Sequence, residues 1–388
     1  MTTPNTEELR HRLKRRRADM SGRLEDVARW SGLSVERLRD IEDGPGPFNV
    51  NEFEQICRGL AVSPGAMYRS EEKTPALSVL RFRSALEETG PLNFRDLRLL
   101  TSIACFGRTL GDLANLSRYP IPFTKFRETI GVDSRLELWE QGYRLGEAAR
   151  ERLGIPAGPL ESVEGILKEL GVHVARIKLD NSTIEAASLW EPGAVPIILL
   201  NTKVSRVHYG LARRAILAHE LCHLLHDTGE ENLTTYVSSA EGDGNYSTDI
   251  ERRARAFAPA FIAPRDQTRR RLQKKKRIRL DNKKLVRSIA KDWGFSWEGA
   301  AWHARNCNYI GPEKAKQLSS QGYRPRDEDW DESFETEMSS GYPPQLMSSD
   351  LPSEVSDVCK GKAELIISSA YMQGDVSLGR ARELLSWE

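Results

Sequence analysis

The chain of 388 residues lacks the features that place a protein in a membrane or in an oxidising compartment. It has no run of 18 or more apolar residues, which excludes a conventional membrane-spanning helix. Its first residues, Met1-Thr2-Thr3-Pro4-Asn5, lack the apolar core of a signal peptide. The five cysteines are odd in number and form no CxxC pair, which argues against a disulfide framework. We therefore expect a cytoplasmic protein with reduced thiols.

The whole chain also lacks an excess of charge of one sign, with 57 Lys and Arg against 56 Asp and Glu. This balance hides two segments of opposite sign. Residues 265–287 are strongly basic, whereas residues 327–357 contain many carboxylates and no Lys or Arg. Such segments bind nucleic acid or acidic partners, contact each other, or are simply solvated, and the pattern does not distinguish these alternatives. Length and composition indicate two or three soluble domains.

Histidine is scarce as well, but two of the seven histidines stand in the pattern His219-Glu220-Leu221-Cys222-His223. Apolar residues with helical spacing flank this segment. On a helix, positions i and i+4 share a face, so His219 and His223 can bind one metal ion. Glu220 then lies beside the metal, where it can accept a proton from a bound water. The alternative is a helix with two solvated or core histidines, but the pattern favours a zinc hydrolase.

A catalytic zinc site needs a third protein ligand. Glu251 is the preferred candidate, because its segment has a helical pattern and the small Ala254 one turn later would allow a close approach. His226 is the alternative, although it lies too close along the same helix to complete a tetrahedron comfortably. Two other histidines are interpreted as structural or surface residues: His208 and His303.

The segment from Leu24 to Ile41 has the pattern of a helix-turn-helix. Gly32 can adopt the positive φ of a tight turn, and Ser34 is a good N-cap for the second helix. In DNA-binding proteins of this kind the second helix enters the major groove. The candidate DNA-contacting residues are Ser34, Val35, Arg37, Arg39 and Asp40, with the basic segment 11–17 available for phosphates. The alternative is a helical module that binds another protein.

Residues 9–69 resemble the XRE (Cro/repressor-like) helix-turn-helix domain. The residues that carry this resemblance are Leu13, Ala28, Gly32, Leu33-Ser34, Ile41-Glu42-x-Gly44 and Leu60-x-Val62-Ser63-Pro64.

Residues 138–264 resemble the ImmA/IrrE metallopeptidases. The matching features are Leu153-Gly154-Ile155, Leu170-Gly171-Val172-x-Val174, Leu200-Asn201, the segment from Arg213 to Leu225, Glu251-x-x-Ala254, Phe257-Ala258 and Phe261-Ile262-Ala263-Pro264. The resemblance implies zinc held by His219, His223 and Glu251, with Glu220 as general base. It also implies a regulatory substrate, because family members cleave helix-turn-helix repressors and often carry a helix-turn-helix domain. The sequence departs from the family at Arg255, where Asn is usual, and at Arg253, where an acidic residue is common.

The expected fold is mainly α with a small β-sheet. Strands are predicted at 171–177, 184–190 and 196–201, and the strand Ile184–Trp190 either holds the substrate backbone by β-augmentation or is an ordinary strand. The predicted organisation is an XRE-type domain (1–72), a helical connector (73–130), an ImmA/IrrE-like peptidase domain (131–265), a basic segment with a small helical module (266–325), an acidic linker (326–360) and a C-terminal helical pair (361–388).

These patterns predict a cytoplasmic, zinc-dependent metalloendopeptidase that binds DNA and cleaves a regulatory protein such as a repressor. The alternative is a non-catalytic transcription regulator or antitoxin-like protein that uses the peptidase fold as a sensor. The expected partners are DNA and a repressor-like or antitoxin-like protein, without a membrane, and a homodimer is compatible with this interpretation.

Overall fold

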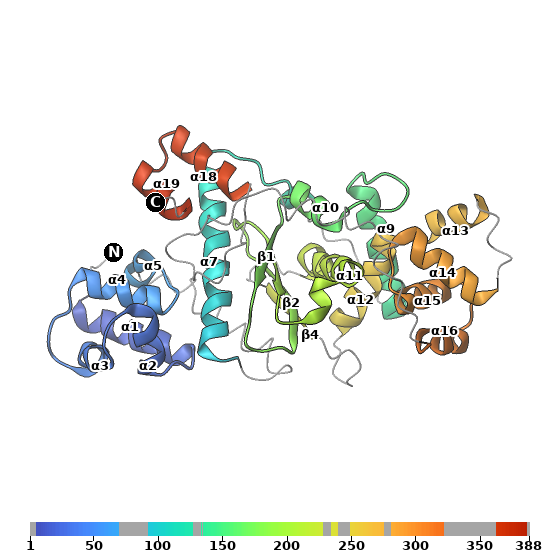
Figure 1. The fold of residues 1–388 in the computed structure, drawn as a ribbon. Coiled ribbons are helices and arrows are strands. Elements are labelled where there is room, and N and C mark those ends of the chain that lie inside the picture. Colours follow the sequence, from blue (N-terminus) through green and yellow to red (C-terminus); the bar gives the residue numbers. More distant parts are fainter. Residues whose placement is uncertain are drawn as a thin grey trace.

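The computed structural model describes residues 5–69, 92–126, 133, 135–227, 234–239, 249–274, 281–321 and 362–385. The predicted fold class, mainly helical with one small sheet, is confirmed. Figure 1 shows one group of helices at one end, the sheet in the middle and a second group of helices at the other end. Among the described helices, none is long and apolar enough to span a membrane.

The N-terminal unit consists of five helices: α1 (Thr6–Asp19), α2 (Leu24–Ser31), α3 (Val35–Asp43), α4 (Val50–Gly59) and α5 (Pro64–Arg69). Gly32 ends α2 with a φ of 76°, a conformation that glycine adopts without strain. The Ser34 side chain accepts a hydrogen bond from the backbone N–H of Arg37 and so caps α3. The local turn geometry agrees with the helix-turn-helix pattern, while membership of the XRE class stays a prediction.

The long helix α7 (Phe94–Leu116) stands between this unit and the sheet (Figure 1). It is buried on several sides, because the N-terminal helices, one face of the sheet and the C-terminal helices all belong to the same apolar core. The C-terminal helices are α18 (Lys362–Met372) and α19 (Leu378–Leu385), which lie within the predicted helical pair. The other predicted domain boundaries stay predictions, and the acidic segment 326–360 lies outside the described residues.

The sheet has the strand order β1-β3-β2-β4, with β1 (His173–Ile177), β2 (Ile184–Trp190), β3 (Ile197–Asn201) and β4 (Thr234–Ser239). β1 and β3 are parallel, and β2 is antiparallel to both of its neighbours. Because β2 is paired along both edges, it has no free edge for a substrate strand. The β-augmentation alternative for this strand is therefore wrong, and β2 is an ordinary interior strand.

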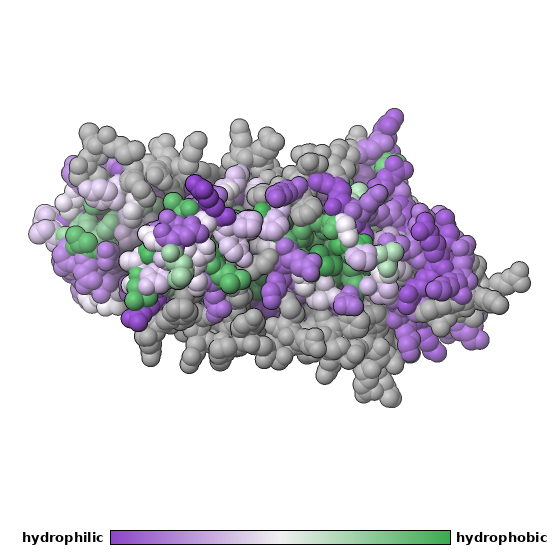
Figure 2. All heavy atoms as spheres, turned by 90° about the horizontal axis from the view of Figure 1, so that it is seen from above, coloured by the Kyte–Doolittle hydropathy of each residue, from purple (hydrophilic) through white to green (hydrophobic). Residues whose placement is uncertain are grey.

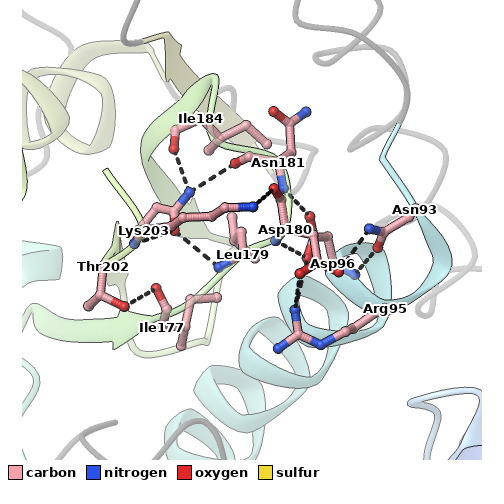
Figure 3. Close-up of polar contacts among 11 residues, drawn as sticks. Asn93, Arg95, Asp96, Ile177, Leu179, Asp180, Asn181, Ile184, Thr202 and Lys203 are labelled. Atoms are coloured by element: carbon pink, nitrogen blue, oxygen red, sulfur yellow. Dashed lines mark hydrogen bonds and ion pairs between the residues drawn. The ribbon is translucent and has the colours of Figure 1, made fainter. Parts of the chain in front are cut away.

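The loop that leads into β2 is fixed to the start of α7. The buried Asp96 accepts hydrogen bonds of 2.8 Å from the backbone N–H groups of Asp180 and Asn181, as Figure 3 shows. The side-chain amide of the buried Asn201 donates to the carbonyl groups of Asn181 (2.9 Å) and Ile184 (2.8 Å). These contacts define where β2 begins.

The opposite face of the sheet packs against the helices that surround the predicted metal site. They are α9 (Leu138–Arg152), α10 (Val163–Leu170), α11 (Gly210–Cys222) and α12 (Asp249–Ile262). Helices α9 and α12 approach closely at Gly142 and Gly146. A Cβ atom at either glycine would lie within 3.0 Å of the backbone of α12, so only glycine fits there.

The far end of the molecule carries α13 (Arg265–Lys274), α14 (Asn282–Trp293), α15 (Trp297–Asn306) and α16 (Pro312–Ser319). Figure 2 shows that this end is strongly hydrophilic. Arg265 itself is half-buried and pairs with Glu140 (2.7 Å) and Glu147 (2.9 Å) of α9. Part of the basic segment therefore fastens α13 to α9, and residues 275–280 lie outside the described residues.

Candidate metal centre

Helix α11 carries the two histidines and the glutamate of the HExxH pattern into the core. His219 and His223 are buried, and Glu220 between them is fully buried. The helix continues into a π-helical turn, His223–Asp227, a distortion that is frequent at functional sites. The Nε2 atoms of His219 and His223 lie 3.0 Å apart, as the i, i+4 spacing predicts for two side chains that face one point.

Glu251 reaches the same point from helix α12. Its Oε2 lies 3.2 Å from His219 Nε2, and its Oε1 lies 3.2 Å from His223 Nε2. Ala254, one turn later, is fully buried, as expected for a helix that approaches this closely. Ligand atoms in a tetrahedral zinc site are separated by roughly 3.3 Å, since the metal–ligand bonds are about 2.0–2.1 Å. The distances and the two-nitrogen, one-oxygen donor set therefore fit zinc.

The alternative ligand His226 does not join this cluster. Its ring contacts Phe257 edge-on, with 5.7 Å between the ring centroids, and burial lowers its pKa to about 4. His303 is buried between Tyr143 and Thr268, while the exposed His208 contacts the carbonyl group of Thr202. The structure places both outside the cluster, as the sequence interpretation expected.

A second layer of charged residues surrounds His223. Its Nδ1 donates a 2.9 Å hydrogen bond to Asp227, whose side chain is fully buried and in turn pairs with Arg253. Burial lowers the pKa of His223, but the hydrogen bonds to Asp227 and Glu251 outweigh it and raise the pKa to about 10. Asp227 fixes the ring orientation and so directs Nε2 toward His219 and Glu251. Arg253, a departure from the family pattern, thus supports a ligand.

Sequence reasoning missed Asp227, although its position four residues after His223 was an available signal. It also missed Glu185 of β2, for which no local pattern exists. Glu185 is buried and accepts a 3.1 Å hydrogen bond from Arg206. Burial raises the pKa of this carboxyl, Arg206 opposes the rise, and the charge of Glu220 adds to it. A further carboxyl group therefore lies close to the metal cluster.

The candidate DNA-contacting residues of α3 have different surroundings. Arg39 and Asp40 are exposed, and Val35 is half-buried. Arg37 forms a two-bond ion pair with Glu52 of α4, at 2.7 and 3.0 Å. The basic segment 11–17 is also largely engaged within the unit. Arg12 contacts α5, and Lys14 contacts Asp43. Arg16 contacts Ala61, and Arg17 contacts Glu42. Fewer of its cations are available for phosphates than the sequence suggested.

Residues 167–301 match the family model Peptidase_M78, which is described as the IrrE N-terminal-like domain. This segment runs from the end of α10 to α15 and contains His219, Glu220, His223 and Glu251. No curated protein and no solved structure matches the chain. The chain thus contains a peptidase domain of the IrrE N-terminal-like type with a candidate metal site, and the match does not extend to the N-terminal helices.

Proposed function

We propose that the chain is a zinc-dependent metalloendopeptidase. The observation that supports this most strongly is the convergence of His219, His223 and Glu251, whose donor atoms lie within 4.8 Å of one another beside the buried Glu220. When bound, zinc lowers the pKa of a coordinated water and polarises a scissile carbonyl group. Glu220 accepts the proton of the attacking water and passes it to the leaving amine. Burial of the cluster excludes bulk water and strengthens each of these electrostatic contacts.

The experiment that tests this proposal compares the wild type with Glu220→Gln on a proteome-derived peptide library, with new termini read by mass spectrometry. We expect about one zinc per chain in both proteins and cleavage products only from the wild type. Glu164→Gln, which changes another buried carboxylate, on helix α10 and outside the metal cluster, should still cleave. Equal cleavage by Glu220→Gln and the wild type would contradict the proposal. Loss of zinc in His219→Ala tests the ligand set separately.

We further propose that the N-terminal unit binds DNA and that the substrate is a regulatory protein. The turn at Gly32, the capped helix α3 and the exposed Arg39 support the first part. Because Arg37 is held by Glu52, we expect Arg39→Ala to weaken DNA binding more than Arg37→Ala. The measurement is the affinity for a random-sequence duplex at several salt concentrations, with Arg135→Ala, an exposed arginine before α9, as control. Unchanged binding in Arg39→Ala would exclude Arg39 as a DNA contact and contradict its role in this proposal.

A further inference from the structure

Glu185 occupies an irregular position in strand β2. The pairing of β2 with β4 passes from Ile184–Ser239 directly to Ala186–Ser238, so Glu185 is an extra residue without a cross-strand partner. A bulge of this kind redirects a side chain and is common next to active sites. Ile184 belongs to the core on the α7 side of the sheet, whereas Ala186 belongs to the core on the α11 side, so the usual alternation of side chains is broken here. The carboxyl group of Glu185 lies within electrostatic reach of His219 and Glu220 of α11. Glu185 therefore projects toward the side that carries α11 and the metal cluster.

The backbone at this bulge is held from one side. The carbonyl group of Ile184, which Figure 3 shows at the end of the polar network, accepts a 2.8 Å hydrogen bond from the Asn201 amide. The network extends through Asn181 to Asp96 of α7. The side chain of Glu185 is thus presented by a rigid support, as a residue that orients a ligand requires.

The Glu185 carboxylate is only half satisfied. The residue is 4% exposed, and its Oε2 accepts the hydrogen bond from Arg206. Its Oε1 is shielded from water and has no hydrogen-bond partner among the described residues. An unpaired acceptor on a buried carboxylate is costly, so such an atom in a native site calls for a donor. Arg206 is half exposed, so the carboxylate lies one side chain away from solvent.

The charges around Glu185 indicate which kind of donor suits it. His219, Glu220 and Arg255 all act electrostatically on its carboxyl group. Glu185, Glu220 and Glu251 carry three negative charges against the four positive charges of Arg206, Arg255 and the divalent metal of the proposed function. A cationic donor would add to this positive excess. A neutral N–H donor satisfies Oε1 without adding charge, and a hydrogen bond to an ionised acceptor is strong.

We infer that Glu185 binds the peptide substrate beside the scissile bond, with its free Oε1 accepting a hydrogen bond from a substrate N–H group. This inference rests on the proposed function, because it assigns a binding contact within the same site. Glu185 is a positioning and specificity residue in this role: it orients the substrate while Glu220 moves the proton. A substrate that lacks the donor leaves Oε1 unpaired and is rejected for that reason.

The test uses the zinc-loaded full chain and a tetrapeptide hydroxamate as the probe, with its Kd measured by calorimetry. The parent probe contains one lysine. In one set of modified probes each backbone amide is N-methylated in turn, which removes a backbone N–H donor. In a separate probe the lysine is replaced by norleucine, which removes the side-chain donor. The variants are Glu185→Ala and Glu185→Gln. Glu164→Ala is the matched control, because Glu164 is also buried and paired with an arginine, Arg176, at 2.5 Å. Zinc content is measured first in every protein.

For the wild type and Glu164→Ala, we expect one modified probe to bind about 10- to 100-fold more weakly than the parent. In Glu185→Ala this ratio should fall to about one, and in Glu185→Gln, which keeps a neutral acceptor, it should be intermediate. An N-methyl probe that behaves in this way assigns the neutral donor to the substrate backbone and supports the inference. If only the norleucine probe behaves in this way, the donor is a charged side chain and the inference of a neutral donor is overturned.

Equal ratios in the wild type and Glu185→Ala for every probe would overturn the inference. If Glu185→Ala loses zinc or unfolds, Glu185→Gln decides the question. A ratio of modified-probe Kd to parent-probe Kd that equals the wild-type ratio in Glu185→Gln would then overturn the inference. Failure of the proposed function looks different: the wild type itself then binds neither zinc nor the hydroxamate, and the inference falls with it.

Discussion

At the scale of single residues, the centre depends on pairs of side chains that hold each other in place. His219, His223 and Glu251 converge because two helices present them at 3.0 to 3.2 Å from one another. The buried side chain of Asp227 and its partner Arg253 then hold His223 in one orientation. The departure of Arg253 from the family pattern therefore has a structural explanation here.

We expect Asp227→Asn to weaken zinc binding by about 10- to 100-fold, the range typical of residues that orient a ligand. The asparagine keeps the size of the side chain but removes the charge that favours the donating tautomer of His223. The measurement is zinc affinity by competition with a chelator. Asp266→Asn, an exposed carboxylate on α13, serves as the control. Wild-type affinity in Asp227→Asn would show that the hydrogen bond does not matter for the metal.

Acid should release the metal, because His223 must lose its proton to bind it. In the metal-free protein, burial lowers the pKa of His223, but the hydrogen bonds to Asp227 and Glu251 outweigh this effect and raise the pKa to about 10. Below that pH the folded protein holds this proton, and zinc displaces it. The apparent zinc affinity should fall by about tenfold per pH unit for one displaced proton. A zinc affinity that is constant between pH 8 and 6 would disagree with this linkage.

At the scale of secondary-structure elements, the position of Glu251 depends on how closely α12 approaches α9 and α11. Gly142 and Gly146 of α9 face the backbone of α12 with no room for a methyl group. The ion pairs of Arg265 with Glu140 and Glu147 lie at the end of the same contact. The packing of α9 against α12 therefore determines how far the Glu251 carboxylate lies from the side chains of His219 and His223.

We expect Gly142→Ala to destabilise the fold by about 1–3 kcal/mol, as overpacking does, and to lower zinc occupancy with it. Thermal unfolding and zinc content measure the two effects. Gly210→Ala is the control, because a Cβ at this first residue of α11 meets nothing within 4 Å. Its stability should stay within about 1 kcal/mol of the wild type. Normal zinc content in a destabilised Gly142→Ala would separate the helix contact from the metal site.

At the scale of the whole molecule, α7 joins the N-terminal unit to the sheet through one continuous apolar core. Arg98 of α7 is buried, donates to the carbonyl groups of Gly59 (3.1 Å) and Arg58 (3.0 Å), and stacks on Trp30. On the other side, Gly107 of α7 accepts a hydrogen bond from the N–H of Val195 next to β3. The DNA-binding and peptidase parts of the proposed function are therefore mechanically connected.

Replacing Arg98 by methionine should loosen this connection and cost about 1–3 kcal/mol, since two buried carbonyl groups lose their donor. Hydrogen exchange of residues 6–69 should accelerate while zinc content stays unchanged. Arg108→Met is the control on the same helix, because its pair with Glu191 is exposed and contributes about 0–1 kcal/mol. Unchanged exchange in Arg98→Met would show that the N-terminal unit does not depend on α7.

Much of this protein could be predicted from its sequence, because the signals are local. The i, i+4 spacing of His219 and His223 places both on one helical face, and Gly32 with Ser34 marks a turn and a cap. Short-range periodicity also indicates the helices and the strands β1 to β3. These features depend on backbone geometry within one or two turns, which neighbouring residues determine by themselves.

Only the tertiary structure decided which distant residues meet. The sequence left Glu251 and His226 as alternative third ligands, and the packing of α12 on α11 shows that Glu251 joins the cluster. The sequence also left β2 as a possible substrate-binding strand, and the pairing of β4 with its second edge excludes that role. Glu185 and Arg253 have no local signature, because their roles arise from a bulge and from an ion pair with Asp227. The sequence by itself thus determined the chemistry of the metal-binding helix. Long-range packing, which no periodicity encodes, decided what completes and surrounds it.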